Sequence, residues 1–255
     1  MLEEFLQLLM SGLASGCVYG LVALGFVLIY KSTEMINFAQ GDFMMFGAFV
    51  MIWLANDNFL GLPFIIAIPC ALIIMAFLSF SFDKCILQRI VGEPQIVVVI
   101  LTIAAGFILR FFAGVFWGYE PLSLETPIVG KYGYFMGAVL SLAEIGVITF
   151  TVLLTILLYA LFYHTKLGIA LIALSQNQLA ASYVGIPVKK LQSLTWSLAG
   201  IVACIAGILY ASKGAVDPSV GLIGIKAFAA AVIGGFGSLS DFPGNLTHPK
   251  IDACR

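Results

Sequence analysis

The chain has 255 residues, of which 62% are hydrophobic and only 10% are charged, and its formal net charge is -1 at pH 7. An average soluble domain is about one quarter charged and less than half apolar, so this composition excludes an ordinary soluble protein and favours a protein of the lipid bilayer. The balanced charge and the lack of a basic run exclude nucleic acid as a main partner. Five cysteines without CxxC spacing and two histidines predict neither a disulfide framework nor a metal site.

Seven windows are apolar enough to cross a membrane as helices, for which about 20 residues are needed. They cover residues 5–30, 42–56, 59–82, 96–117, 137–163, 191–212 and 222–239. The first window is too long for a cleaved signal peptide and follows acidic rather than basic residues, so it is predicted to be a spanning helix. The pattern predicts an all-α integral membrane protein with about seven transmembrane helices, some of them broken, over residues 1–239.

The basic residues near the window ends predict the orientation, because positive charge is retained on the cytoplasmic side. An external N-terminus puts six of them in cytoplasmic loops: Lys31, Lys84, Arg89, Lys166, Lys189 and Lys190. It leaves Lys131 and Lys213 outside, with Lys226 at the outer edge of the seventh window. We therefore expect a multi-pass protein whose N-terminus lies outside the cytoplasm.

The short second window begins with a polar interruption, the stretch INFAQGDFMMFGAF of residues 36–49. Its candidate site residues are Asn37, Gln40, Gly41 and Asp42. In lipid, a broken helix or an unpaired polar group costs several kcal/mol, so such breaks occur where they face protein or line a cavity. The stretch is therefore predicted to line or gate a substrate pathway. The alternative is a cytoplasmic helix cap, with Asp42 as the N-cap and no contact to substrate.

The seventh window contains a second interruption, the glycines of residues 229–239. Gly234, Gly235 and Gly237 occur within four positions of one another. Transporter sites are often built from paired, glycine-interrupted segments, and residues 37–47 with 233–239 fit such a pair. The alternative is that small residues there allow close helix packing.

A few charged residues lie inside or close to the windows, and each is a functional candidate by default. Arg110 is expected to extend its side chain to the outer interface near Trp117, in preference to a substrate contact. Asp83 and Glu144 lie near window ends, where water can solvate them. None of these residues predicts a proton relay at mid-membrane depth, which argues against an ion-coupled transporter.

Three stretches together resemble the membrane-spanning permease of bacterial branched-chain amino acid ABC transporters. They are INFAQGDFMMFGAF (36–49), LGIALIALSQNQLAASYVGI (167–186) and VDPSVGLIGIKAFAAAVIGGFGSL (216–239). The resemblance covers about residues 5–239 and implies an ABC importer permease in the cytoplasmic (inner) membrane, surrounded by membrane lipid. It implies no enzymatic activity and no cofactor bound by this chain. Its implied partners are a second, similar permease, two ATP-binding subunits that use ATP, and a periplasmic or lipid-anchored substrate-binding protein.

The inner loop of residues 163–192 is predicted to contain a short helix over 170–184 that ends near Gly185, with Pro187 just beyond it. No GxxxxGK[ST] motif occurs, so ATP is not bound by that route. The resemblance implies that this helix couples the permease to the ATPase. The candidate coupling residues are Ala173, Asn177, Ala180, Ala181 and Gly185. The family commonly has an arginine before the alanine of this loop, where this chain has Ile172.

The last 16 residues, SDFPGNLTHPKIDACR (240–255), form a divergent polar tail that is too short and too polar to span a membrane. The family continues with about two further spans at this point. We therefore interpret the tail as a truncation or a shifted reading frame, with a natural short variant as the alternative. Within the transporter class, a permease for urea or short-chain amides is the second hypothesis. An ion-coupled secondary transporter and a structural membrane scaffold are the hypotheses from other classes.

Overall fold

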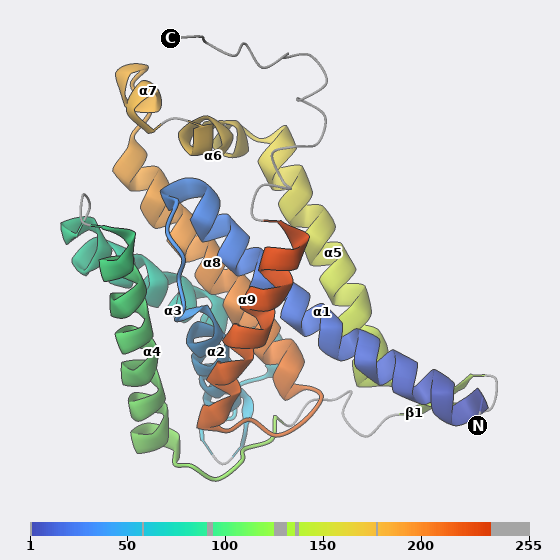
Figure 1. Cartoon of the computed structure of the whole chain (residues 1–255). Coiled ribbons are helices and arrows are strands. Elements are labelled where there is room, and N and C mark those ends of the chain that lie inside the picture. Colours follow the sequence, from blue (N-terminus) through green and yellow to red (C-terminus); the bar gives the residue numbers. More distant parts are fainter. Residues whose placement is uncertain are drawn as a thin grey trace.

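The computed structural model describes residues 2–57, 59–90, 94–124, 132–135, 138–176 and 178–235. Within these residues, five helices are long and apolar enough to cross a membrane (Figure 1). They are α1 (Leu2–Thr33), α3 (Phe64–Cys85), α4 (Gln95–Trp117), α5 (Leu142–His164) and α8 (Val188–Ala211). Two shorter apolar helices, α2 (Gln40–Ala55) and α9 (Ile223–Gly234), lie among them. The predicted class, an all-α membrane protein with some broken helices, is confirmed.

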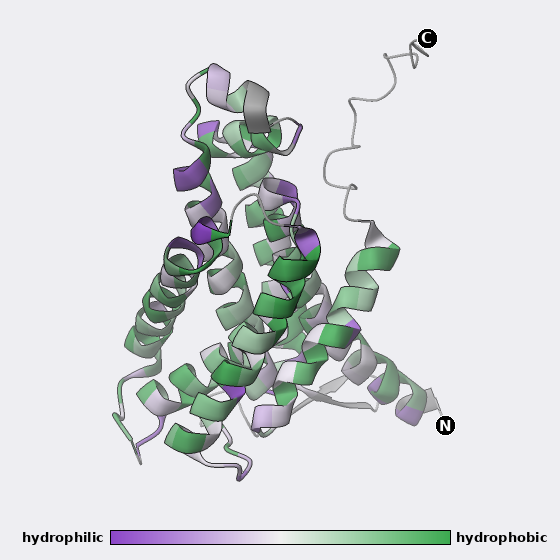
Figure 2. Cartoon of the chain, turned by 60° about the vertical axis from the view of Figure 1, so that its left-hand side comes forward, coloured by the Kyte–Doolittle hydropathy of each residue, from purple (hydrophilic) through white to green (hydrophobic). Residues whose placement is uncertain are grey.

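The burial of the long helices separates an inner set from an outer set. In the most apolar window of α8, 67% of residues are buried, and in α1 56% are, whereas α3, α4 and α5 each have 22% buried. The exposed side chains of the outer helices are large and apolar, such as Ile100, Phe107 and Phe111 on α4. Figure 2 shows hydrophobic residues along these helices, with the hydrophilic ones mostly near helix ends and in loops. The outer surface therefore suits contact with lipid chains.

Helix α8 forms the centre of the bundle and packs against α1, α2 and α3. Several of its inward positions are small, and at Gly200 and Gly207 even a methyl group would meet neighbouring backbone. A Cβ at Gly200 would lie 3.0 Å from the Met75 carbonyl of α3, and one at Gly207 would lie 2.9 Å from the Ala48 amide of α2. Small residues allow this close approach of helices, on which packing in lipid depends.

A β-hairpin precedes α5. Its strands β1 (Tyr132–Phe135) and β2 (Ala138–Ser141) pair antiparallel, with Tyr132 opposite Ser141 and Phe135 opposite Ala138. The sequence windows placed a helix from residue 137, and this is wrong, because the helix begins at Leu142. A short apolar run such as 138–141 fits either a strand or a helix, and periodicity alone does not separate them.

Two further short elements complete the described chain. The 3-10 helix η1 (Leu87–Arg89) follows α3, and η2 (Pro218–Leu222) precedes α9. Asp217 caps η2, because its carboxylate accepts a hydrogen bond from the Ser219 amide at 2.6 Å. An isolated antiparallel bridge between Leu122 and Val216 joins the segment after α4 to the segment after α8.

The inner loop is helical on both sides of residue 177, which lies outside the described residues, and these helical stretches cover most of the helix predicted over 170–184. They are α6 (Lys166–Gln176) and α7 (Gln178–Tyr183). Thr165 caps α6, since its hydroxyl accepts a hydrogen bond from the Gly168 amide at 3.1 Å. After α7, the Gly185 amide donates to the Ser182 carbonyl and the Ile186 amide to the Ala181 carbonyl, and Gly185 has φ 87°. This pattern is a Schellman motif, so the predicted ending near Gly185 is confirmed.

Candidate functional site

The chain leaves the helical path between α1 and α2. Helix α1 ends at Thr33, and Glu34 has φ 56°, a left-handed conformation that is uncommon for a residue other than glycine. The Thr33 hydroxyl donates to the Ile29 carbonyl at 2.8 Å and accepts from the Met35 amide at 3.4 Å. The chain then runs between the other helices to α2, which is buried along nearly its whole length (Figure 1). The break therefore starts at the exposed Glu34 and leads into the bundle, where Asn37 and Gln40 are buried.

Asn37 and Gln40 form a hydrogen-bonded unit at this break. The Asn37 Oδ1 atom accepts from the Ala39 amide at 3.1 Å, and its Nδ2 donates to Gln40 Oε1 at 3.3 Å. Gln40 Nε2 donates to the Ala199 carbonyl of α8 at 3.1 Å. Both side chains are only 1% exposed. The protein itself thus satisfies the polar groups that an apolar environment would otherwise leave unpaired.

Asp42 forms an ion pair with Arg110 of α4. Arg110 Nε donates to Asp42 Oδ1 at 2.5 Å, and a second guanidinium nitrogen lies 3.4 Å from Oδ2. The Asp42 side chain is 4% exposed and that of Arg110 is 23% exposed. The N-cap of α2 is Ala39, without a side-chain cap hydrogen bond. Asp42 is therefore not the cap, and Arg110 does not extend to the outer interface, because a carboxylate buried among helices requires a counterion.

Four glycines pack at the ion pair and at the first turn of α2, and we call them the glycine cradle: Gly41, Gly106, Gly221 and Gly224. A Cβ at Gly106 or at Gly221 would overlap the Asp42 carboxylate, and one at Gly224 would lie 2.9 Å from the Gly41 Cα. The cradle brings α4, η2 and α9 onto the first turn of α2. The sequence analysis did not find Gly106, Gly221 or Gly224, although the three-residue spacing of Gly221 and Gly224 is a signal for two positions on one face.

The predicted glycine interruption at the end of the seventh window lies at the opposite end of α9 from the cradle. Helix α9 ends at Gly234, and Gly235 has φ 79° and donates its amide to the Val232 carbonyl. A Cβ at Gly234 would meet no atom within 4 Å. Gly237 lies outside the described residues. The glycines that contact α2 are those at the start of α9, and a pathway role for Gly234 and Gly235 stays a prediction.

The predicted coupling residues are distributed over α6 and α7. Ala173 is half-buried on α6, Ala181 is buried on α7, and Gly185 ends α7. Asn177 lies outside the described residues, and Ala180 is described only as a position within α7. Tyr183 and Val184 follow with 86% and 82% of their surface exposed. The segment thus presents apolar surface at one end of the bundle, and its coupling role stays a prediction.

Asp83 holds the start of α8 against α3. Its carboxylate accepts from the Ser193 hydroxyl at 2.6 Å and from Gln88 Nε2 at 2.9 Å. Gln88 Nε2 also donates to the Lys189 carbonyl at 3.2 Å. The expectation that water solvates Asp83 is wrong, since the residue is only 3% exposed. The hydrogen bonds instead fix the beginning of α8, directly after α7, to its neighbour.

Comparison with known proteins assigns the family. The family model described as "Branched-chain amino acid transport system / permease component" matches residues 8–242. BraD of Pseudomonas aeruginosa, a high-affinity branched-chain amino acid permease protein, is 26% identical over 92% of this chain and 81% of its own length. LivH of Escherichia coli K12, which carries the same description, is 26% identical over 92% and 80%. A probable LivH of Methanocaldococcus jannaschii is 33% identical over 86% and 71%.

No solved structure gives a significant match to the chain. The family model nevertheless spans α1 to α9, including the break at Asn37, the Asp42–Arg110 pair and the α6–α7 segment. The helices found in the structure agree with a multi-pass membrane protein. The chain therefore belongs to the family of permease components of branched-chain amino acid transport systems.

Proposed function

We propose that the chain is the membrane-spanning permease subunit of an ABC importer that carries branched-chain amino acids across the cytoplasmic membrane. The observation that carries this proposal is the family match over residues 8–242, which includes nearly every described helix. The three relatives named above are permeases of branched-chain amino acid transport, and none of them is named for urea or amide transport. ATP binds to and is hydrolysed by partner subunits, and this chain binds no cofactor.

The proposed partners are a second homologous permease, two ATP-binding subunits and a periplasmic or lipid-anchored substrate-binding protein. The distribution of basic residues supports the orientation. Lys31 and Lys84 belong to the last turns of α1 and α3, and Lys166 and Lys189 to the first turns of α6 and α8. These helix ends lie toward the end of the bundle that carries α6 and α7 (Figure 1), whereas Lys213 follows the opposite end of α8. The end with α6 and α7 then faces the cytoplasm, where the ATP-binding subunits are.

Helix α8 is proposed to carry movement from the coupling segment to the break. It begins directly after α7, and Asp83 and Ser193 join its first turns to α3. Six residues after Ser193, the Ala199 carbonyl accepts the hydrogen bond from Gln40 at the break. A displacement of α7 by the ATPase would move α8 and change its contacts with α2 and α3. ATP would thus shift the balance between inward-facing and outward-facing states.

The first turn of α2 is proposed as the gate. Asn37, Gln40, Gly41 and Asp42 connect it to α8, to α4 and to the start of α9. The break separates the first turn of α2 from α1. Because this turn is bonded to several neighbours, it can follow the movement of one of them only after its bonds to the others are broken. A segment with such alternative sets of contacts has the discrete states that a gate requires.

The test is reconstitution in proteoliposomes with the second permease, both ATP-binding subunits and the binding protein, loaded with leucine or with urea. We expect the leucine-loaded protein to stimulate ATP hydrolysis and leucine uptake, and the urea-loaded protein to stimulate neither. An ATP-binding subunit without its Walker A lysine is the control. Leucine uptake that continues with this inactive subunit would favour an ion-coupled transporter, and stimulation by urea alone would overturn the substrate class.

A further inference from the structure

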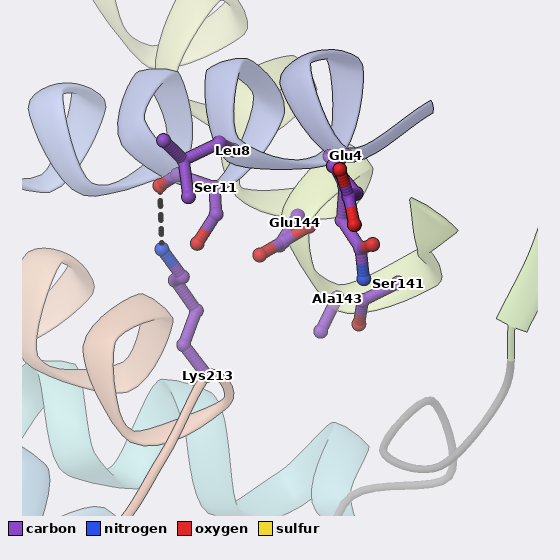
Figure 3. Close-up of a pocket in the computed structure, with 8 residues that line it drawn as sticks. Glu4, Leu8, Ser11, Ser141, Ala143, Glu144 and Lys213 are labelled. Carbon is purple, nitrogen blue, oxygen red and sulfur yellow. Dashed lines mark hydrogen bonds between the residues drawn. The ribbon is translucent and has the colours of Figure 1, made fainter. Parts of the chain in front are cut away.

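A cavity of about 560 Å³ lies where α1, α5 and the segment after α8 meet, at the end of the bundle opposite α6 and α7 (Figures 1 and 3). Its volume falls within the range of small-molecule sites, about 300–1,000 Å³. The lining residues are Glu4, Gln7, Leu8, Ser11, Ser141, Ala143, Glu144 and Lys213. The cavity thus combines one cation, two carboxylates, several neutral polar groups and two apolar side chains.

Lys213 provides the positive charge of this cavity. Its ammonium donates to the Ser11 carbonyl at 3.2 Å, drawn as a dashed line in Figure 3, and to the Ser15 hydroxyl at 2.8 Å. It forms no ion pair within the described part of the chain. Burial lowers the pKa of Lys213, although the Glu144 carboxylate acts in the opposite direction. An ammonium has three donors, so one remains for a ligand.

Glu144 faces the same cavity from the first turn of α5 (Figure 3). Its charge acts on Lys213, yet no ion pair or hydrogen bond joins it to another described residue. Two opposite charges therefore face one cavity without contacting each other. The Glu4 side chain, a second carboxylate, lies along the wall formed by α1.

The combination of charges limits the chemical class of a ligand. An anion such as phosphate would meet the carboxylate of Glu144, and a simple cation would meet the ammonium of Lys213. A zwitterion satisfies both signs at once, since its carboxylate pairs with a lysine and its ammonium with a carboxylate. Hydrogen bonds to charged groups are the strong ones, which suits recognition of the charged end of an amino acid.

We propose that this cavity is a binding subsite for a free amino acid, with the α-carboxylate on Lys213 and the α-ammonium on Glu144. Leu8 and Ala143 provide apolar contact for its side chain. This inference rests on the proposed function as an amino acid importer. It adds to that function the place where the substrate is first held. With the N-terminus outside, it lies on the side from which a binding protein delivers its amino acid.

The test is weak binding of leucine to the full chain in lipid nanodiscs, measured by saturation-transfer NMR. Leucine is compared with leucinamide, which lacks the carboxylate, and with 4-methylpentanoate, which lacks the ammonium. We expect leucine to bind at least about tenfold more tightly than either analogue, because each loses one charged contact. Lys213→Met and Glu144→Gln should each weaken leucine binding by about the same factor.

Two variants serve as controls. Lys226→Met removes an exposed lysine of α9 outside the cavity and should leave leucine binding unchanged. Lys213→Arg keeps the charge and should retain most of the binding, which separates loss of the contact from loss of the fold. Equal binding of the three ligands by the wild-type chain, or leucine binding unaffected by Glu144→Gln, would overturn the subsite.

Uptake in the reconstituted complex separates this proposal from the proposed function. Leucine uptake without leucine binding in the cavity would remove the subsite and leave the importer in place. Absence of leucine uptake, with the complex assembled, would remove the proposed function itself. If Lys213→Met loses leucine binding and the complex that contains it takes up less leucine, the result supports both the subsite and the proposed function.

Discussion

Asp42 and Arg110 meet inside the bundle, whereas Glu144 and Lys213 face a cavity near one end without contact. Each pair consists of one carboxylate and one side-chain cation on neighbouring helices or helix ends. The first pair is closed, with 2.5 Å between Arg110 Nε and Asp42 Oδ1 and glycines on several sides. The second leaves a volume of about 560 Å³ around it. We call the first pair closed, because its two charges contact each other and join two helices. We call the second pair open, because its two charges remain accessible to a ligand in the cavity.

The largest difference between the two pairs is expected on removal of the cation. Arg110→Met leaves the Asp42 carboxylate buried without a partner, which we expect to lower the free energy of unfolding by about 3 kcal/mol. Lys213→Met removes a cation that has no ion pair in the described chain and should cost less than about 1 kcal/mol. Thermal unfolding of both variants in detergent measures the contrast.

The double variant Asp42→Asn with Arg110→Met sharpens this comparison, since neither charge then remains. We expect it to recover much of the stability that Arg110→Met loses, through the coupling that contacting residues show in a double-mutant cycle. The same cycle on Glu144 and Lys213 should give a much smaller coupling, because the two charges act on each other only across the cavity. Similar costs for Arg110→Met and Lys213→Met would contradict the distinction between closed and open pairs.

A smaller effect is expected from glycine substitutions beside each pair. Gly221→Ala places a methyl group against the Asp42 carboxylate and 3.1 Å from Arg110 Nε, and should destabilise the chain by about 1–3 kcal/mol. Gly214→Ala, next to Lys213, places its methyl group in open space and is the matched control, with little expected change. Melting temperatures compare the two, and an equal response would mean that the cradle is not tightly packed.

The smallest expected effect is a pH dependence that belongs to the open pair. Burial lowers the pKa of Lys213 in the folded chain below the ordinary 10.5. Between the lowered value and 10.5, the unfolded chain binds more protons than the folded chain, so stability rises with pH in that window. We expect the melting temperature of the wild type to rise relative to that of Lys213→Met as pH increases there. Parallel pH profiles would exclude this contribution from Lys213.

The sequence predicted the class of the fold and most helices, because length and hydropathy are sufficient to recognise a membrane-spanning segment. It also located the break at Asn37, since polar residues stand out between apolar windows. It failed at the start of α5, where residues 138–141 form a strand. This failure concerns a short segment whose structure depends on what it packs against.

The partners of the candidate site were beyond prediction from one sequence. Asp42 and Arg110 are 68 positions apart, and no local pattern indicates that their side chains meet. Arg110 was expected at the interface and Asp83 in water, because each lies within reach of a helix end. The structure buries both carboxylates, Asp42 and Asp83, and provides the donors that burial requires. Such pairings follow from helix packing, which hydropathy does not encode.

The small residues of α8 have a mechanical consequence. A helix face with large side chains interlocks with its neighbours, and relative motion then needs many rotamer changes. Beyond Trp196, which packs against Phe82 of α3, the face of α8 toward α2 and α3 instead includes Ala199, Gly200 and Gly207, all of them buried. Such a nearly smooth contact permits sliding along the helix axis at low cost, so the expected motion of α8 is shear and not hinge bending.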